Sequence, residues 1–170
     1  MSEQLIMITL RLLHIGAGVF WVGSVLFMNI FVLPPIQAAG PEGGKLAAVL
    51  MRGGRIQRAM IHAALVTMIS GFLIYGRFIM VTDGAWASSV PAMGYGLGAI
   101  ASVIAFLLGI LIGAPAARRL QAIGANDGGP LTADQEGEVR RLRARMSTAS
   151  RFALPLLVVA VISMAVSRYL

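Results

Sequence analysis

The chain has 170 residues, of which 58% are hydrophobic and 12% are charged, and its formal net charge is +7. Its mean hydropathy is +0.82, and its apolar runs are longer than the roughly 20 residues that cross a bilayer. These features exclude an ordinary soluble protein and indicate an integral membrane protein. The length predicts that residues 1–170 form one domain. The absence of cysteine excludes disulfides, thiolate metal sites and cysteine-attached haem.

Four apolar runs predict four membrane-spanning helices, which cover about residues 5–33, 60–80, 91–117 and 152–170. The first run is too long for a cleaved signal segment, so we expect it to remain as a membrane anchor. It should end before Pro34 and Pro35, because proline cannot continue a helix, whereas Pro91 occupies a favoured first-turn position in the third run. Four spans with short connections predict an all-α, antiparallel four-helix bundle in the membrane.

Two linkers, residues 36–59 and 118–151, hold 11 of the 14 lysines and arginines. The positive-inside rule therefore predicts that both linkers are cytoplasmic and both termini lie outside, as in a multi-pass protein of the bacterial inner membrane. A linker helix is expected over about residues 133–150, because Thr132 and Gln135 fit a capping box. Since these basic residues flank apolar runs, we expect their partner to be the lipid bilayer with its anionic headgroups and not nucleic acid.

The third span is rich in small residues. Gly94, Gly98 and Ser102 recur at intervals of four, and Gly109 and Gly113 repeat the spacing. Such stripes let helix backbones approach closely in lipid. The pattern is compatible with packing inside the chain, with a homodimer contact through this span, or with room for a bulky planar cofactor.

The only two histidines, His14 and His62, lie inside the predicted spans. An ionisable residue in the membrane is a functional candidate, because lipid offers it no partner, although a neutral imidazole can also simply hydrogen-bond a neighbouring helix. Arg11 lies three residues before His14 and Arg58 four before His62, which places each arginine on the face of its histidine. A haem would use this arrangement, with the imidazole on the iron and the cation near the propionates. Arginines at span ends that reach toward the interface give the same spacing.

The expected depths of the histidines differ. His14 lies 19 residues before Leu33, roughly 28 Å at 1.5 Å per residue, whereas His62 lies near the start of the second span. The two histidines are therefore expected near opposite faces of the bilayer, in separate sites and not on one iron. Methionine sulfur suits haem iron or Cu(I). We expect Met80 near the depth of His14 and Met60 near that of His62, as second ligands or as core filler.

Residues 10–34, LRLLHIGAGVFWVGSVLFMNIFVLP, contain a histidine, then a tryptophan, a small residue and a final proline. This segment resembles the first helix of a superfamily of small membrane bundles that includes the copper-resistance D (CopD) domain, the HemJ-type protoporphyrinogen oxidases and the membrane part of bacterial urate oxidases. Residues 55–71 resemble the second helix of CopD domains. The residues that carry the resemblance are His14, Trp21, Gly23, Asn29, Pro34, Ser70 and Gly71.

The resemblance implies that His14 matches the histidine proposed as haem ligand in HemJ-type proteins. The lysine-containing later helix of those proteins has no counterpart here, because Lys45 is the only lysine and lies in a linker. The resemblance therefore implies a haem cofactor but does not imply protoporphyrinogen oxidase activity.

The sequence thus predicts a membrane protein that binds haem b and acts in electron transfer or redox chemistry, with a quinone or a redox protein as partner. His14 would be the axial ligand and His62 the ligand of a second site, with Arg11 and Arg58 at the propionates. Trp21, seven residues after His14 and on nearly the same face, would contact the cofactor or fill the core.

Two alternatives to the haem hypothesis remain. None of the three hypotheses decides whether the protein is an enzyme. The first is copper transport or handling through ligands without thiolates, namely His14, His62, Met80 and Met60. The second is a non-catalytic membrane subunit or a dimeric structural protein, with the glycine stripe as its interface.

Overall fold

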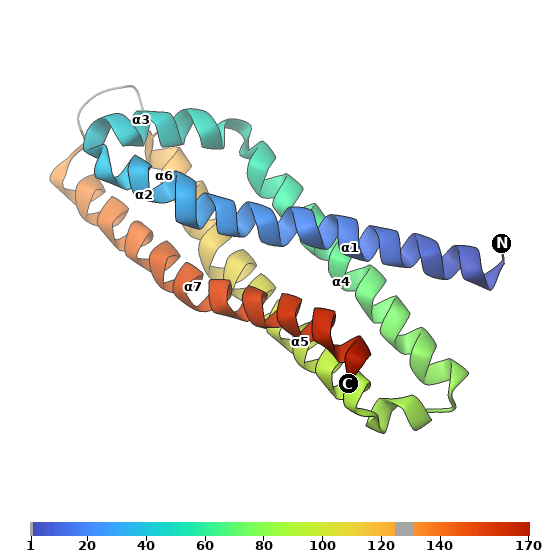
Figure 1. Ribbon diagram of the computed structural model, residues 1–170. Helices are drawn as coiled ribbons and strands as arrows, with labels where there is room; N and C mark the ends of the chain where they lie inside the picture. Colours follow the sequence, from blue (N-terminus) through green and yellow to red (C-terminus); the bar gives the residue numbers. More distant parts are fainter. Residues whose placement is uncertain (1, 125–130) are drawn as a thin grey trace.

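The computed structural model describes residues 2–124 and 131–170, and these residues form helices and connecting turns with no strand (Figure 1). Four helical stretches are long and apolar enough to cross a membrane, which confirms the four predicted spans as helices. They cover Glu3–Ala38, Arg55–Val81, Val90–Gly124 and Ala133–Tyr169.

The four stretches pair into two hairpins. Helix α1 (Glu3–Phe27) packs along α4 (Arg55–Val81), and α5 (Val90–Leu108) packs along α7 (Ala133–Val166). Contacts between the two hairpins are far less extensive than those within each. In Figure 1 the N-terminal part of α1 (blue) accordingly extends away from α5 and α7. The bundle is therefore two helix pairs joined over limited areas.

Trp21 is the centre of the first area that joins the hairpins. Its buried indole meets Phe106 edge to face, with ring centroids 6.3 Å apart and ring planes at 83°. Small side chains from α4, α5 and α7 allow the helices to meet around it. The buried members of this cluster are Trp21, Ala64, Ala105, Ala153 and Leu157. Of the two expectations for Trp21, filling the core is the one that the packing shows.

Trp86 is the centre of the second area, at the turn between α4 and α5. It lies in the short 3-10 helix η3 (Ala85–Ser88). The centroid of its ring is 5.0 Å from that of Tyr75, 5.1 Å from that of Phe78 and 6.2 Å from that of Tyr95. The Tyr75 hydroxyl donates a hydrogen bond to a backbone carbonyl of α5 at 3.3 Å. This aromatic cluster holds the second hairpin against the first.

The first helical stretch does not end at Pro34 and Pro35, so that prediction is wrong. A π-helical turn, η1 (Met28–Val32), precedes the prolines, and the N–H of Leu33 donates to the carbonyl five residues earlier. The chain then continues as α2 (Leu33–Ala38) with the prolines in its first turn. A proline there breaks no helix bond, because first-turn N–H groups have no acceptor within their own helix. The π turn therefore lets the helix pass the prolines.

The third span has the same arrangement, a π-helical turn followed by a proline in the first turn of the next helix. A second π-helical turn, η4 (Gly109–Gly113), ends with the N–H of Ala114 donating to the carbonyl of Gly109. The chain continues as α6 (Ala114–Gly124), in which Pro115 is the second residue, as Pro34 is in α2. The helix consequently runs beyond its expected end at residue 117.

The connection between the hairpin helices α1 and α4 folds back on itself. Helix α3 (Gly40–Met51) packs along α2 (Figure 1). The short turn η2 (Arg52–Gly54) then reverses into α4, with Gly53 and Gly54 at φ values of 71° and 61° that other residues rarely adopt. Because α3 returns along α2, α4 begins beside a part of α1 well before the first helical stretch ends.

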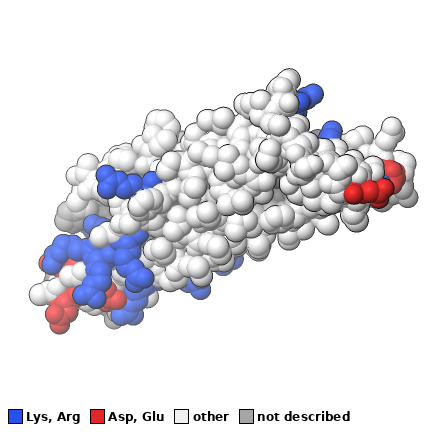
Figure 2. Space-filling view, turned by 90° about the horizontal axis from the view of Figure 1, so that it is seen from below, with Lys and Arg blue, Asp and Glu red and all other residues white. Residues whose placement is uncertain are grey.

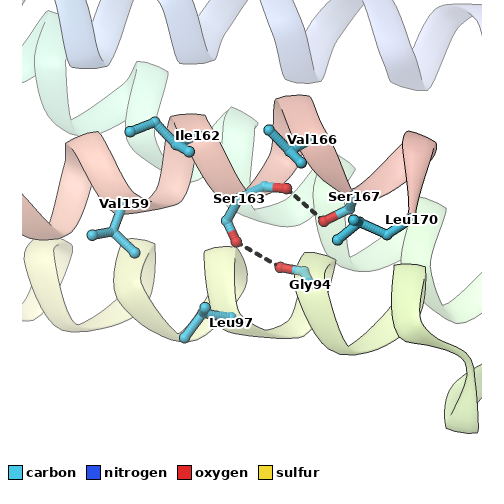
Figure 3. Close-up of a pocket in the computed structure, with 8 residues that line it drawn as sticks. All are labelled: Gly94, Leu97, Val159, Ile162, Ser163, Val166, Ser167 and Leu170. Carbon is cyan, nitrogen blue, oxygen red and sulfur yellow. Dashed lines mark hydrogen bonds between the residues drawn. The ribbon is translucent and has the colours of Figure 1, made fainter.

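The glycine stripe of the third span is covered by α7. The Ser163 hydroxyl donates to the carbonyl of Gly94 at 2.8 Å (Figure 3). A Cβ atom at Gly98 would lie 2.9 Å from Cγ of Met164. At these two positions the stripe therefore serves packing inside the chain. A Cβ atom at Gly109, in contrast, would meet nothing within 4 Å among the described atoms.

The predicted linker helix forms the first half of α7 and is continuous with the fourth span. The capping box is confirmed, since the Thr132 side chain accepts from the N–H of Gln135 and the Gln135 side chain accepts from the N–H of Thr132. This part of α7 packs on α6 through an apolar seam whose buried members are Ala116, Ile123 and Leu142. We call residues 114–124 and 131–151 the basic arm. Figure 2 shows most of the lysines and arginines gathered at one end of the molecule.

An ion pair links the two helices of the basic arm. Nε of Arg119 donates to a carboxylate oxygen of Glu138 at 2.8 Å. This hydrogen bond holds the pKa of the Glu138 carboxyl below its ordinary value and raises the pKa of the Arg119 guanidinium. Both side chains lie at the surface, so the pair contributes little stability.

Replacing Thr132 with alanine should loosen the start of α7. Loss of an N-cap side chain costs about 1 kcal/mol, which corresponds to roughly fivefold faster local opening. Hydrogen exchange at the amides of Gln135 and Glu136 measures this. Thr148→Ala, an exposed change further along the same helix, is the control and should leave those amides unaltered. Unchanged exchange in Thr132→Ala would show that the cap adds no stability.

Candidate functional site at the crossing of α1 and α4

His14 joins the two helices of the first hairpin. Its Nδ1 atom lies 2.7 Å from the backbone carbonyl oxygen of Thr67, which is 53 residues away in sequence. A carbonyl oxygen can only accept a hydrogen bond, so Nδ1 carries the proton and donates it. In the neutral imidazole the lone pair then resides on Nε2. The contact therefore selects the tautomer of His14 and orients its ring.

Two glycines make this contact possible. A Cβ atom at Gly71 would lie 2.7 Å from Cε1 and 2.9 Å from Nδ1 of His14, so the imidazole rests directly on the backbone of α4. On the opposite helix, a Cβ atom at Gly18 would lie 3.4 Å from Cγ2 of Thr67. The helices thus approach closely because both surfaces lack side chains at these points.

The polar side chains around the histidine have their own partners within α4. The Thr67 hydroxyl donates to the carbonyl of Ala63 at 2.8 Å. The Ser70 hydroxyl donates to the carbonyl of Val66 at 2.5 Å and lies 3.1 Å from that of Thr67. Across the described residues no buried side-chain nitrogen or oxygen lacks a partner. What remains available for chemistry at this crossing is Nε2 of His14.

His62 lies on a different face of α4. It is exposed and precedes Thr67 by five residues, which turns it about 140° around the helix axis from the face that meets α1. Arg58, one turn before it, is exposed as well. Met60 is two positions away, roughly 160° around the helix, and so does not share a face with His62. The structure therefore does not bring Met60, the predicted second ligand, to the face of His62.

The histidines do not lie near opposite ends of the bundle, which differs from the expected depths. Thr67 is the 13th of the 27 residues of α4, so His14 contacts the middle of that helix. Along α4 the level of His14 is about 8 Å from that of His62, five residues at 1.5 Å each. The depth estimate from Leu33 failed because α3 folds back and shifts the pairing of α1 with α4.

The other sequence candidates do not gather around His14. Met80 lies nine residues beyond Gly71 and is 67% exposed. Arg11 is exposed one turn closer to the N-terminus. Among the side chains that the structure describes, no group of three or more His, Cys, Asp or Glu could hold a metal ion. Sequence reasoning found His14 and named Gly71 only as part of the resemblance, and it missed Thr67, although small and polar residues at helical spacing in the second span were a readable signal.

A hollow of about 300 Å³ lies between α5 and α7 (Figure 3). Its walls are aliphatic apart from Ser163 and Ser167. Their hydroxyls donate to the carbonyls of Gly94 and Ser163, respectively. The hollow therefore offers an apolar surface and no free side-chain donor, and it does not include His14.

Comparison of the chain with protein-family models, with curated proteins and with solved structures found no match. The resemblance of the first two spans to the CopD and HemJ-type bundles therefore stays a prediction.

Proposed function

We propose that this protein is a haem b protein of the bacterial inner membrane that acts in electron transfer or quinone-linked redox chemistry, with His14 as axial ligand. The hydrogen bond from Nδ1 of His14 to the Thr67 carbonyl carries the proposal. A histidine that ligates a metal usually donates its other ring N–H to a carbonyl or a carboxylate. That bond leaves Nε2 as the ligating atom and holds the ring in place.

The residues at the crossing of α1 and α4 fit a haem on the side where His14 would be its axial ligand. Nε2 of His14 has no hydrogen-bond partner among the described residues. Gly71 leaves the ring its space, and Arg11 provides a cation one turn away for a propionate. The bound iron would supply one-electron transfer. The chain's own part is to hold the imidazole in one tautomer within an apolar bundle.

Membrane insertion is part of the same proposal. Four helices have the required length and hydropathy, and most of the positive charge lies at one end (Figure 2). We place that end, with α2, α3 and the basic arm, in the cytoplasm, and both termini outside.

Copper handling has less support from the geometry. A Cu(I) site needs two or three soft ligands that converge. His14 contacts the face of α4 that contains Thr67, whereas His62 lies on a different face of that helix. Met80 is exposed far from both histidines. The described residues thus offer no convergent copper set.

The proposal is tested by the visible spectrum of protein produced with added haem precursor and purified in mild detergent. The wild type should show a Soret band that disappears in His14→Gln. A glutamine amide can still donate to the Thr67 carbonyl but cannot act as an axial ligand, so the loss would not come from separating the helices. His62→Ala is the matched control and should keep the band.

A colourless wild type, or a band that persists in His14→Gln, would refute haem ligation by His14. Stoichiometric Cu(I) in a colourless preparation would favour the copper alternative instead. A colourless, metal-free protein that purifies with a partner would favour a non-catalytic membrane subunit.

A further inference from the structure

The haem site proposed at His14 does not use Arg58 or His62, and both belong to a regular stripe on α4. Six exposed residues follow one another at intervals of three and four along this helix. Residues with that spacing lie on a single helix face. We call this the α4 stripe, which consists of Arg55, Arg58, His62, Leu65, Ile69 and Phe72.

The stripe changes character along its length. Its first three members are basic or polar and its last three are large and apolar. Among the described residues, no carboxylate pairs with Arg55 or Arg58. The stripe faces away from α1, because the surface that meets α1 contains Thr67 and Gly71. A polar head and an apolar tail therefore follow one another on an uncovered face.

The position of the stripe matches the depth profile of a bilayer. Arg58 and Arg77 are 19 residues apart on α4, about 29 Å at 1.5 Å per residue, close to the hydrocarbon thickness of about 30 Å. Arg58 then lies at the edge of the hydrocarbon, where lipid ester groups are found, and Arg55 lies about one turn further out, toward the lipid phosphates. His62 lies one turn deeper, about 6 Å, and its side chain is tilted back toward the helix N-terminus and so toward the ester groups. The apolar members lie at the depth of acyl chains.

We propose that the α4 stripe is a binding site for one anionic phospholipid. Arg55 and Arg58 hold the phosphate, His62 donates to the phosphate or to an ester oxygen, and Leu65, Ile69 and Phe72 contact an acyl chain. The charge at the head of the stripe selects an anionic lipid such as phosphatidylglycerol over a zwitterionic one. This inference rests on the membrane insertion in the proposed function but not on haem ligation.

Native mass spectrometry of the full chain in detergent tests the site, with phosphatidylglycerol or phosphatidylcholine added at equal concentration. The wild type should retain one phosphatidylglycerol in preference to phosphatidylcholine. Arg55→Ala/Arg58→Ala should bind it more weakly by roughly fivefold for each arginine removed, and His62→Ala should weaken it further when combined. Arg143→Ala/Arg145→Ala removes the same charge from exposed positions of the basic arm and should bind as the wild type does.

Several results would overturn the proposal. Equal loss in the two double variants would mean that the lipid responds to overall charge, and equal retention of both lipids would mean that no anionic site exists. Full competition by inorganic phosphate at millimolar concentration would identify a phosphate site without lipid specificity. The Soret band of the same samples reports haem separately, and solubility without detergent would reveal a failure of membrane insertion.

Discussion

Gly71→Leu is expected to lower the free energy of unfolding by about 2–3 kcal/mol, the typical cost of inserting a side chain into filled space. The new Cβ alone would lie 2.7 Å from Cε1 of His14. The imidazole must therefore move, and its bond to the Thr67 carbonyl is lost. Thermal unfolding in detergent, followed by circular dichroism, measures the change. If haem is bound, the Soret band should weaken in the same variant.

Gly76→Leu is the matched control, because it lies in the same helix and a Cβ atom there would meet nothing within 4 Å among the described atoms. It should be close to neutral. The effect of Gly71→Leu should also shrink in a His14→Ala background, since the clashing ring is then absent. Equal destabilisation by Gly71→Leu and Gly76→Leu would contradict the close contact between the His14 imidazole and the backbone of α4 at Gly71.

Gly98→Leu is expected to separate α5 from α7 and to lower the free energy of unfolding by about 3 kcal/mol. A Cβ atom there would lie 2.9 Å from Cγ of Met164 and 3.2 Å from the backbone carbonyl oxygen of Ala160. A side chain can rotate away, but a backbone carbonyl within a helix cannot, so relief requires the helices to move apart. The thermal midpoint measured by circular dichroism should fall accordingly.

Gly109→Leu provides the comparison for Gly98→Leu. Gly109 is in the same helical stretch but is exposed, and a Cβ atom there would meet nothing within 4 Å among the described atoms. Its substitution should change stability little. If Gly109→Leu proved as harmful as Gly98→Leu, a contact outside the described chain, such as a homodimer through Gly109 and Gly113, would become the better explanation for the glycine pattern of this span.

The helices themselves could be predicted because their signals are local. Length and apolar composition identify a span without knowledge of its neighbours, and Thr132 with Gln135 identifies a helix start by the bonds they exchange. The end of the first helical stretch was predicted wrongly, since Pro34 alone is a stop signal. Its effect depends on the π-helical turn before it, which has no residue signature of comparable strength.

Of the candidate site, the sequence predicted His14 but not its partner on α4. His14 is conspicuous because a histidine in an apolar run is costly. Its partner is a backbone carbonyl, which every residue of α4 possesses, so no residue type marks it. Which carbonyl it meets depends on how far α3 folds back along α2, and that distance follows from tertiary packing. The role of Gly71 depends on the same pairing of α1 with α4, so the sequence alone does not reveal it.

The two hairpins also bear on the order in which the molecule is assembled during synthesis. Each pair consists of helices that follow one another in the chain, and most contacts lie within a pair. The first pair is complete once α4 has left the ribosome, so His14 can reach Thr67 before α5 has emerged. The second pair then docks on the first through the surfaces around Trp21 and Trp86. Assembly in two local steps keeps the His14 imidazole from remaining without a partner while the rest of the chain is made.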